Sequence, residues 1–194
     1  MFLLALTLSS ACAVAEPPPP AITPVATGVR LVSDGGPLAA LTAERVAMAA
    51  EDRAEASGVS AELAGGVPLT LRADRSSWDL KTRQVLFEGA VVAERGPFRL
   101  TCDRLQVEAD AAGAPRRALA SGAVRVTREG WTAESAEAEL RLPEGVLTLT
   151  GQPKVSDGRS ELSGARVVLH MDEERIECEG CTLVLPDPLK LAEP

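Results

Sequence analysis

Apolar and polar positions alternate along most of this chain. Two runs show the alternation clearly: Val85, Phe87, Gly89, Val91 and Ala93, and Leu147, Leu149, Gly151, Pro153 and Val155. A period of two is typical of a β-strand that buries one face and exposes the other. The pattern therefore predicts half-buried strands from about residue 28 onward.

Six glycines recur at a nearly constant spacing. They are Gly28, Gly58, Gly89, Gly122, Gly151 and Gly180, at intervals of 30, 31, 33, 29 and 29 residues. Each opens a similar phrase: an alternating run, a polar turn, and a second run built on L/T-x-A/C-D/E-R. Such a period indicates stacked supersecondary units. Because glycine within a strand marks a bulge or a bend, we expect every unit to bend at the same level.

Turn sequences divide each unit into two strands. Glycine-containing turns such as 95–97 and 129–130 close one side of the stack, and turns such as 79–82 and 143–145 close the other. The chain then holds about a dozen strands without a helix, which is an all-β, antiparallel fold built from hairpin repeats.

One segment fits two structures. Residues 38–56 are rich in Ala, Glu and Arg and follow Pro37, which favours a helix by local propensity. Yet 41–46 aligns with 100–105, and 56–58 with 120–122. Because repeat register overrides a weak propensity, we predict strands here.

The N-terminal residues are typical of export. Residues 1–15 are apolar and end in Ala13-Val14-Ala15, which predicts a cleaved signal peptide and an exported protein. A less favoured alternative is a lipoprotein anchored through Cys12. Residues 16–27 hold five prolines and are expected to form an extended linker. The repeats then form one domain over 28–188, with a tail at 189–194.

Composition narrows the function. Hydrophobic residues make up 45% of the chain but aromatic residues only 3%, so the core must be aliphatic. Few aromatic residues and a net charge of -8 argue against nucleic-acid binding. The charge is uneven, because residues 72–117 hold 9 Lys or Arg against 7 Asp or Glu.

The sequence offers little for catalysis or metal binding. His170 is the only histidine, and no phosphate loop or nucleophile motif stands out. Cys178 and Cys181 are three residues apart, which in a straight strand is too far for a disulfide. They form one only if Gly180 bends the chain sharply; free thiols or, less readily, a metal or redox role remain open. We therefore expect a protein that is not an enzyme and has no metal or other cofactor.

The ordered motifs resemble a known family. VLFEG-x-V at 85–91, the ADR and CDR triplets at 73–75 and 102–104, and LTLTG-x-P-x-V at 147–155 resemble the OstA-like family of periplasmic lipopolysaccharide-export bridge proteins. The resemblance runs from about Leu69 to Leu185. It implies a β-jellyroll or β-taco, in which two rows of antiparallel strands enclose an apolar groove open at both ends.

The resemblance also implies a function and partners. Such proteins are non-catalytic and carry lipopolysaccharide with its acyl chains in the groove. They connect an inner-membrane export complex to an outer-membrane assembly protein by edge-strand addition, with possible head-to-tail self-association. The alternatives are an inner-membrane-anchored component of the same system and an exported structural or adhesive repeat protein with a filled core.

Alternate residues of a strand point to the same face, and the apolar residues on the face expected to point inward are the expected lipid-groove residues. They are Val85, Phe87, Val91, Leu100, Leu105, Val107, Val124, Val126, Leu147, Leu149, Val155, Val167, Leu169, Leu183 and Leu185.

Overall fold

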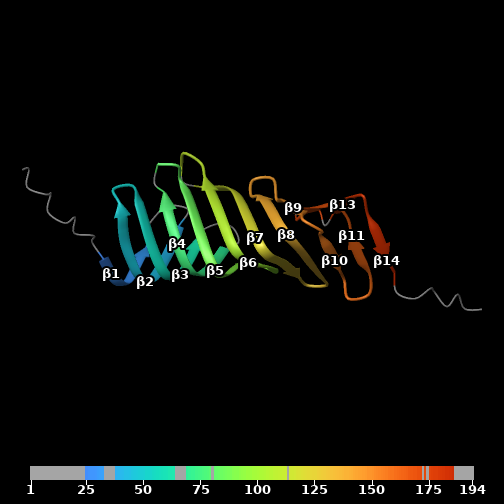
Figure 1. The fold of residues 1–194 in the computed structure, drawn as a ribbon, viewed down its shortest axis with the longest axis horizontal. Coiled ribbons are helices and arrows are strands. Elements are labelled where there is room, and N and C mark those ends of the chain that lie inside the picture. The colour runs from blue at the N-terminus through green and yellow to red at the C-terminus, as the bar shows by residue number, and fades with distance from the viewer. Residues whose placement is uncertain are drawn as a thin grey trace, which may run out of the picture.

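The computed structural model describes residues 25–32, 38–63, 69–79, 81–112, 114–171, 173 and 175–185, and within them every element is a strand (Figure 1). The expected signal peptide, the first nine residues of the linker and the tail lie outside this part of the chain. The strands are β1 (Val25–Val32), β2 (Leu38–Ala50), β3 (Arg53–Leu63), β4 (Leu69–Asp79), β5 (Gln84–Arg95), β6 (Phe98–Ala109), β7 (Pro115–Arg128), β8 (Trp131–Arg141), β9 (Val146–Thr150), β10 (Lys154–Ser156), β11 (Glu161–Ser163), β12 (Arg166–His170), β13 (Arg175–Glu179) and β14 (Thr182–Val184).

The fourteen strands form one antiparallel sheet. From β1 to β8 each strand pairs with the next one in sequence, so the array grows in one direction, and its two ends lie far apart in Figure 1. The all-β, antiparallel prediction is confirmed. Residues 38–56 belong to β2 and β3, because repeat pairing outweighs the helical propensity of this segment.

Beyond β8 the sheet divides into two branches. The N-terminal part of β8 pairs with β10, and its C-terminal part pairs with β9. One branch continues through β11 to β14, and the other through β12 to β13. We call the half of the sheet that ends in β14 the first arm and the half that ends in β13 the second arm.

The recurring glycines lie where the two arms meet. All six have a φ between 59° and 79°, which side-chain-bearing residues rarely adopt. On β5, Gly89 and Ala90 together lie opposite the single residue Asp103 of β6, which is a β-bulge. A bulge bends its strand, so the repeated glycine forms a crease along the sheet, as its spacing predicted.

In three of the repeats an acidic residue packs over the glycine of the next strand. A Cβ added to Gly122 would lie 2.8 Å from the Cβ of Asp103, and one added to Gly89 would lie 2.9 Å from the Cβ of Asp74. Gly58 is in similar contact with Glu44. In these three repeats the D/E of the sequence motif and the glycine form one cross-strand contact, whereas Gly151 packs against Ala136.

Apolar side chains fill the space inside the crease. Ala133, Leu149 and Val167 are fully buried, and a single cluster of Val, Leu and Ala side chains extends from β2 to β12. Cys102 lies in this cluster as a free thiol. Burial raises the pKa of Cys102 to about 11. This aliphatic core agrees with the scarcity of aromatic residues.

The array begins before the expected domain boundary at residue 28. Val25 is already paired with Ala47 of β2, so the last three residues of the expected linker belong to β1. The apolar side chains of Val25 and Val29 continue the alternation past the proline-rich segment, and this allows the strand to start early.

We predict that Gly122→Ala lowers the free energy of unfolding by about 2–3 kcal/mol, because it combines an unfavourable φ with a clash against Asp103. Gly130→Ala is the matched control, since Gly130 has a φ of 89° and no atom near its added Cβ. It should lose only about 1 kcal/mol. Urea denaturation measures both, and equal losses would contradict the crease contact.

We predict that the Cys102 thiol is protected in the folded protein. Its raised pKa lowers the thiolate fraction, so native alkylation at pH 8.5 should be about 75-fold slower than in the unfolded chain. Because the folded pKa is the higher one, stability should fall as pH rises from the ordinary thiol pKa of 9.0 towards about 11. Peptide-resolved mass spectrometry after iodoacetamide treatment checks the reactivity; rapid modification of the native protein would overturn the prediction.

Candidate functional site

An apolar cavity of about 720 Å³ lies between the two arms. The first arm contributes side chains such as Leu71 and Leu100, and the second contributes Phe87 and Leu105. The full lining is Leu41, Ala61, Leu69, Leu71, Trp78, Asp79, Arg83, Gln84, Val85, Phe87, Ala93, Arg95, Pro97, Phe98, Leu100, Leu105, Val107, Ala109, Pro115, Ala118, Leu140, Leu142, Pro143, Gly145 and Met171. Such a volume falls within the range of about 300–1,000 Å³ typical of ligand pockets.

The residues expected to line a groove are distributed over three environments. The cavity is lined by Val85, Phe87, Leu100, Leu105 and Val107. The buried core, outside the lining of both described cavities, holds Val91, Val124, Val126, Leu147, Leu149, Val155 and Val167. Leu169 is buried beside a second cavity.

Leu183 and Leu185 are instead exposed, at 56% and 64% of their surface. Leu183 lies on the edge strand β14, which among the described strands pairs only with β11, and Leu185 directly follows β14. Their parity is inward, but within the described residues no further strand covers them.

Several cavity residues were missed by the sequence reasoning. Trp78, Phe98 and Leu140 lie at or near the ends of their strands, and Met171 lies in a turn. The turn signals placed the ends of these strands close to where they are, but the list of expected groove residues left out the strand ends. The signal that could have identified Trp78 and Leu140 is the inward parity itself, continued to the strand ends.

Three charged residues line the cavity at its rims: Asp79, Arg83 and Arg95. The Asp79 carboxylate accepts hydrogen bonds from the backbone N–H groups of Thr82 (2.8 Å) and Lys81 (3.0 Å). These contacts, with the Thr82 N–H the strongest, hold the pKa of Asp79 below its usual range. Asp79 thus organises the turn between β4 and β5 and stays ionised.

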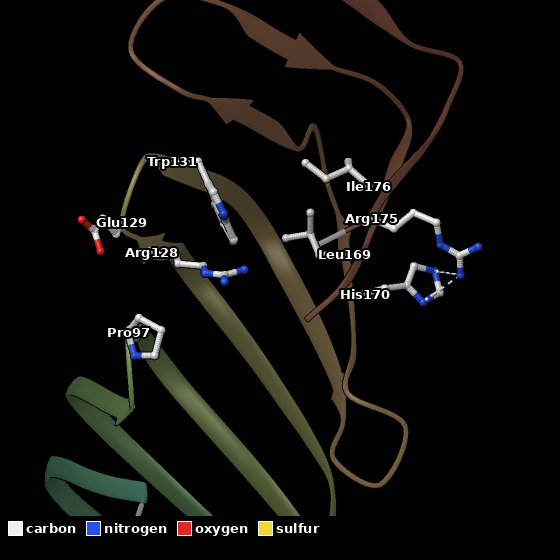
Figure 2. A pocket seen from close by; sticks show the side chains of 8 residues that line it. All are labelled: Pro97, Arg128, Glu129, Trp131, Leu169, His170, Arg175 and Ile176. Atoms are coloured by element: carbon white, nitrogen blue, oxygen red, sulfur yellow. Dashed lines mark hydrogen bonds between the residues drawn. The ribbon is translucent and has the colours of Figure 1, made fainter. Parts of the chain in front are cut away.

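A second cavity, of about 520 Å³, lies between the β7–β8 turn and β12–β13 (Figure 2). The rings of Trp131 and Phe98 pack in a T-shaped contact, with centroids 6.3 Å apart. The Arg128 guanidinium lies 5.0 Å from the Phe98 centroid. On the opposite wall Arg175 contacts His170 at 3.2 Å and forms an ion pair with Glu173. Cationic and anionic groups are mixed here, so this cavity has no strong preference for charge.

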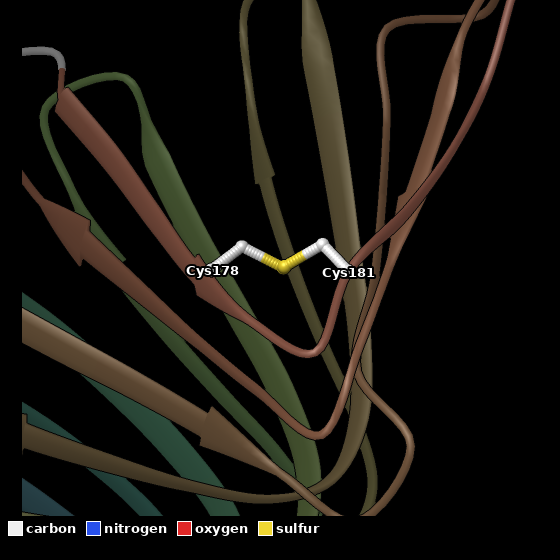
Figure 3. Close-up of a disulfide and its surroundings, with 2 residues drawn as sticks. All are labelled: Cys178 and Cys181. Atoms are coloured by element: carbon white, nitrogen blue, oxygen red, sulfur yellow. A yellow bond between two sulfur atoms is a disulfide. The ribbon is translucent and has the colours of Figure 1, made fainter.

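Cys178 and Cys181 form a disulfide in the structure (Figure 3). Their Cα atoms are 5.9 Å apart, because Gly180 between them adopts a φ of 62° and turns the chain. Cys178 belongs to β13 and Cys181 immediately precedes β14, so the bond joins the two arms at the last crease position. A side chain at Gly164 would clash with the Cys178 sulfur.

The described residues contain no group of three or more His, Cys, Asp or Glu side chains that could hold a metal ion. No helix among them is long and apolar enough to span a membrane. What the described residues do offer is an apolar cavity with charged rims, suited to holding an amphiphile.

Comparison with known proteins places this geometry in a family. Residues 70–175 match the model for the LptA/(LptD N-terminal domain) LPS transport protein family. The fold is similar to the crystal structure of LptH from Pseudomonas aeruginosa, described as the LptA-homologous periplasmic component of the lipopolysaccharide transport device. The TM-score is 0.56 at 15% identity, over 61% of this chain and 94% of that one. No curated protein matches the chain. Because the family match spans more than half of its sequence, the chain belongs to the LptA/(LptD N-terminal domain) family of lipopolysaccharide transport proteins.

Proposed function

We propose that this protein carries lipopolysaccharide across the periplasm with its acyl chains held in the cavity between the arms. The observation that carries the proposal is an apolar cavity enclosed by two arms in a chain of the lipopolysaccharide transport family. The role is binding and transfer, without catalysis. LptH, which shares the fold, is described as periplasmic, and this supports the proposed compartment.

The energetics favour such a site. Each methylene exposed to water costs about 0.8 kcal/mol, so moving an acyl chain between membranes requires a continuous apolar surface. Leu71, Phe87, Leu100 and Leu105 provide that surface. The charged side chains stand at the rims, where a polar headgroup would remain in water. A scaffold with a filled core would have no use for the cavity.

Edge strands support end-to-end bridging. Within the described residues β1 pairs only with β2, and β13 and β14 each pair on one side. The edges expose large apolar side chains, including Ile176, Leu183 and Val184 at 44%, 56% and 56%. Unpaired edges with apolar side chains are suited to strand addition by another chain. A second copy, the inner-membrane export complex and the outer-membrane assembly protein are the proposed partners.

The cavity assignment predicts a side-specific crosslink to lipid. A photoreactive phenylalanine analogue at Leu105 should crosslink to lipopolysaccharide, because Leu105 lines the cavity. The same analogue at Gln106 is the matched control, since the next residue of a strand points to the opposite face. Gel mobility and anti-lipopolysaccharide detection after irradiation measure the adducts.

Equal adducts at both positions, or adducts only from Gln106, would overturn the cavity as the lipid site. Phe87 offers an independent position on the neighbouring strand, opposite Leu105. Leu149 is fully buried outside the cavity and should give a weaker adduct than either.

The bridging assignment predicts concentration-dependent assembly. Leu183→Lys together with Leu185→Lys should abolish association between copies, because charge on an edge strand opposes strand addition. Both side chains are exposed, so folding should be unaffected. Ala111→Lys with Ala112→Lys is the control, since it adds the same charge in an exposed turn away from the edge strands. Light scattering over a concentration series measures the mass; a double variant that assembles like the unmodified chain would contradict this edge as the contact.

A further inference from the structure

One strand carries both charged rims of the cavity. Arg83 directly precedes β5, and Arg95 is its last residue. Because β5 crosses the crease at Gly89, these two arginines stand on opposite arms, and both line the cavity. They are exposed, so each guanidinium is open to a ligand that enters from solvent.

The structure holds Arg83 in place through its backbone. Its φ is 57°, and its carbonyl oxygen accepts a hydrogen bond from the N–H of Ala109 at 3.1 Å. Asp79 caps the same turn through Lys81 and Thr82. Arg95 is positioned by pairing with Leu69 on one side and Phe98 on the other. Both side chains therefore project from ordered strand ends.

Many cationic side chains of this protein already have an anionic partner. These ion pairs include Arg53–Asp79, Arg99–Glu94, Arg104–Glu88, Arg117–Glu139, Arg125–Glu134, Arg141–Glu139, Lys154–Glu161 and Arg175–Glu173. Among the described residues, neither Arg83 nor Arg95 forms an ion pair. The third charged residue of the cavity, Asp79, is engaged by Arg53 and by two backbone N–H groups. The rims thus present unbalanced positive charge.

We propose that the cavity selects amphiphiles with an anionic headgroup, a phosphate or a carboxylate, and that Arg83 and Arg95 are the residues that recognise it. The inference rests on the proposed function, in which an acyl chain occupies the cavity. A guanidinium donates paired N–H groups that match the oxygens of either anion. No existing ion pair of Arg83 or Arg95 has to break when the ligand binds.

The second cavity provides a contrast within the same protein. Its cations Arg128 and Arg175 are accompanied by Glu129 in the lining and by Glu173 and Glu177 beside Arg175. An anion there would meet carboxylates as well as guanidinium groups. Charge complementarity therefore favours the larger cavity as the anionic site.

Binding of two probes with the same chain tests the proposal. The full chain is titrated by calorimetry with dodecyl phosphate and with dodecyl maltoside, which is neutral, each below its micelle concentration. Arg83→Gln with Arg95→Gln should weaken dodecyl phosphate binding about tenfold and leave dodecyl maltoside unchanged. The tenfold difference should shrink at high salt, since the rims are exposed.

Arg72→Gln with Arg75→Gln is the matched control, because these exposed arginines of β4 form no ion pair among the described residues and do not line the cavity. It should bind both probes like the unmodified chain. If the unmodified chain binds both probes and the Arg83 and Arg95 variant keeps its phosphate affinity, the proposed headgroup recognition is overturned while the lipid cavity stands. If neither probe binds the unmodified chain, the lipid cavity is overturned as well.

Discussion

The contact between an acidic side chain and a glycine on the next strand is the constraint on which this fold depends. Strands as long as β4 to β8 would form a nearly continuous sheet without a bend, with one face open to water. The glycine supplies a backbone conformation that other residues rarely adopt, and the acid packs where a side chain would otherwise be. The contact joins β2 to β3, β4 to β5 and β6 to β7, and Ala136 takes the place of the acid against Gly151. Because these contacts align, the strands bend at the same level. The two arms, and the space between them, follow from that alignment.

The bend also separates two kinds of chemistry. On the inner face of the bend, the alternate residues of both arms are aliphatic, and many of those near the crease are alanines. Outside it, ion pairs link neighbouring strands, as between Arg117 and Glu139, where the guanidinium lowers the pKa of the carboxyl. Exposed pairs of this kind add little stability, but they keep the outer face soluble. The apolar surface is thereby confined to the interior and the edges.

Much of the fold could be predicted from the sequence, because the fold is local and periodic. Alternation gave the buried face, the glycine spacing gave the crease, and repeat register placed 38–56 in strands. The cavity could not be located in the same way. Parity tells which face Leu149 and Phe87 share, but whether the opposing arm touches a side chain depends on how far apart the arms stand. Leu183 has the expected parity and still is exposed, since parity cannot show whether another strand among the described residues covers it. The pairing of Cys178 and Cys181 depended on the backbone angle at Gly180, which spacing alone left open.

The pairing of each strand with its sequence neighbours has a consequence for how such proteins can change. From β1 to β8, each strand pairs only with the strand before it and the strand after it in the sequence. Adding or removing one glycine-to-glycine unit would lengthen or shorten the space between the arms without altering its cross-section. The length of the strand array and the cross-section of the space between its arms are thus separate properties, which evolution or a designer can change one at a time.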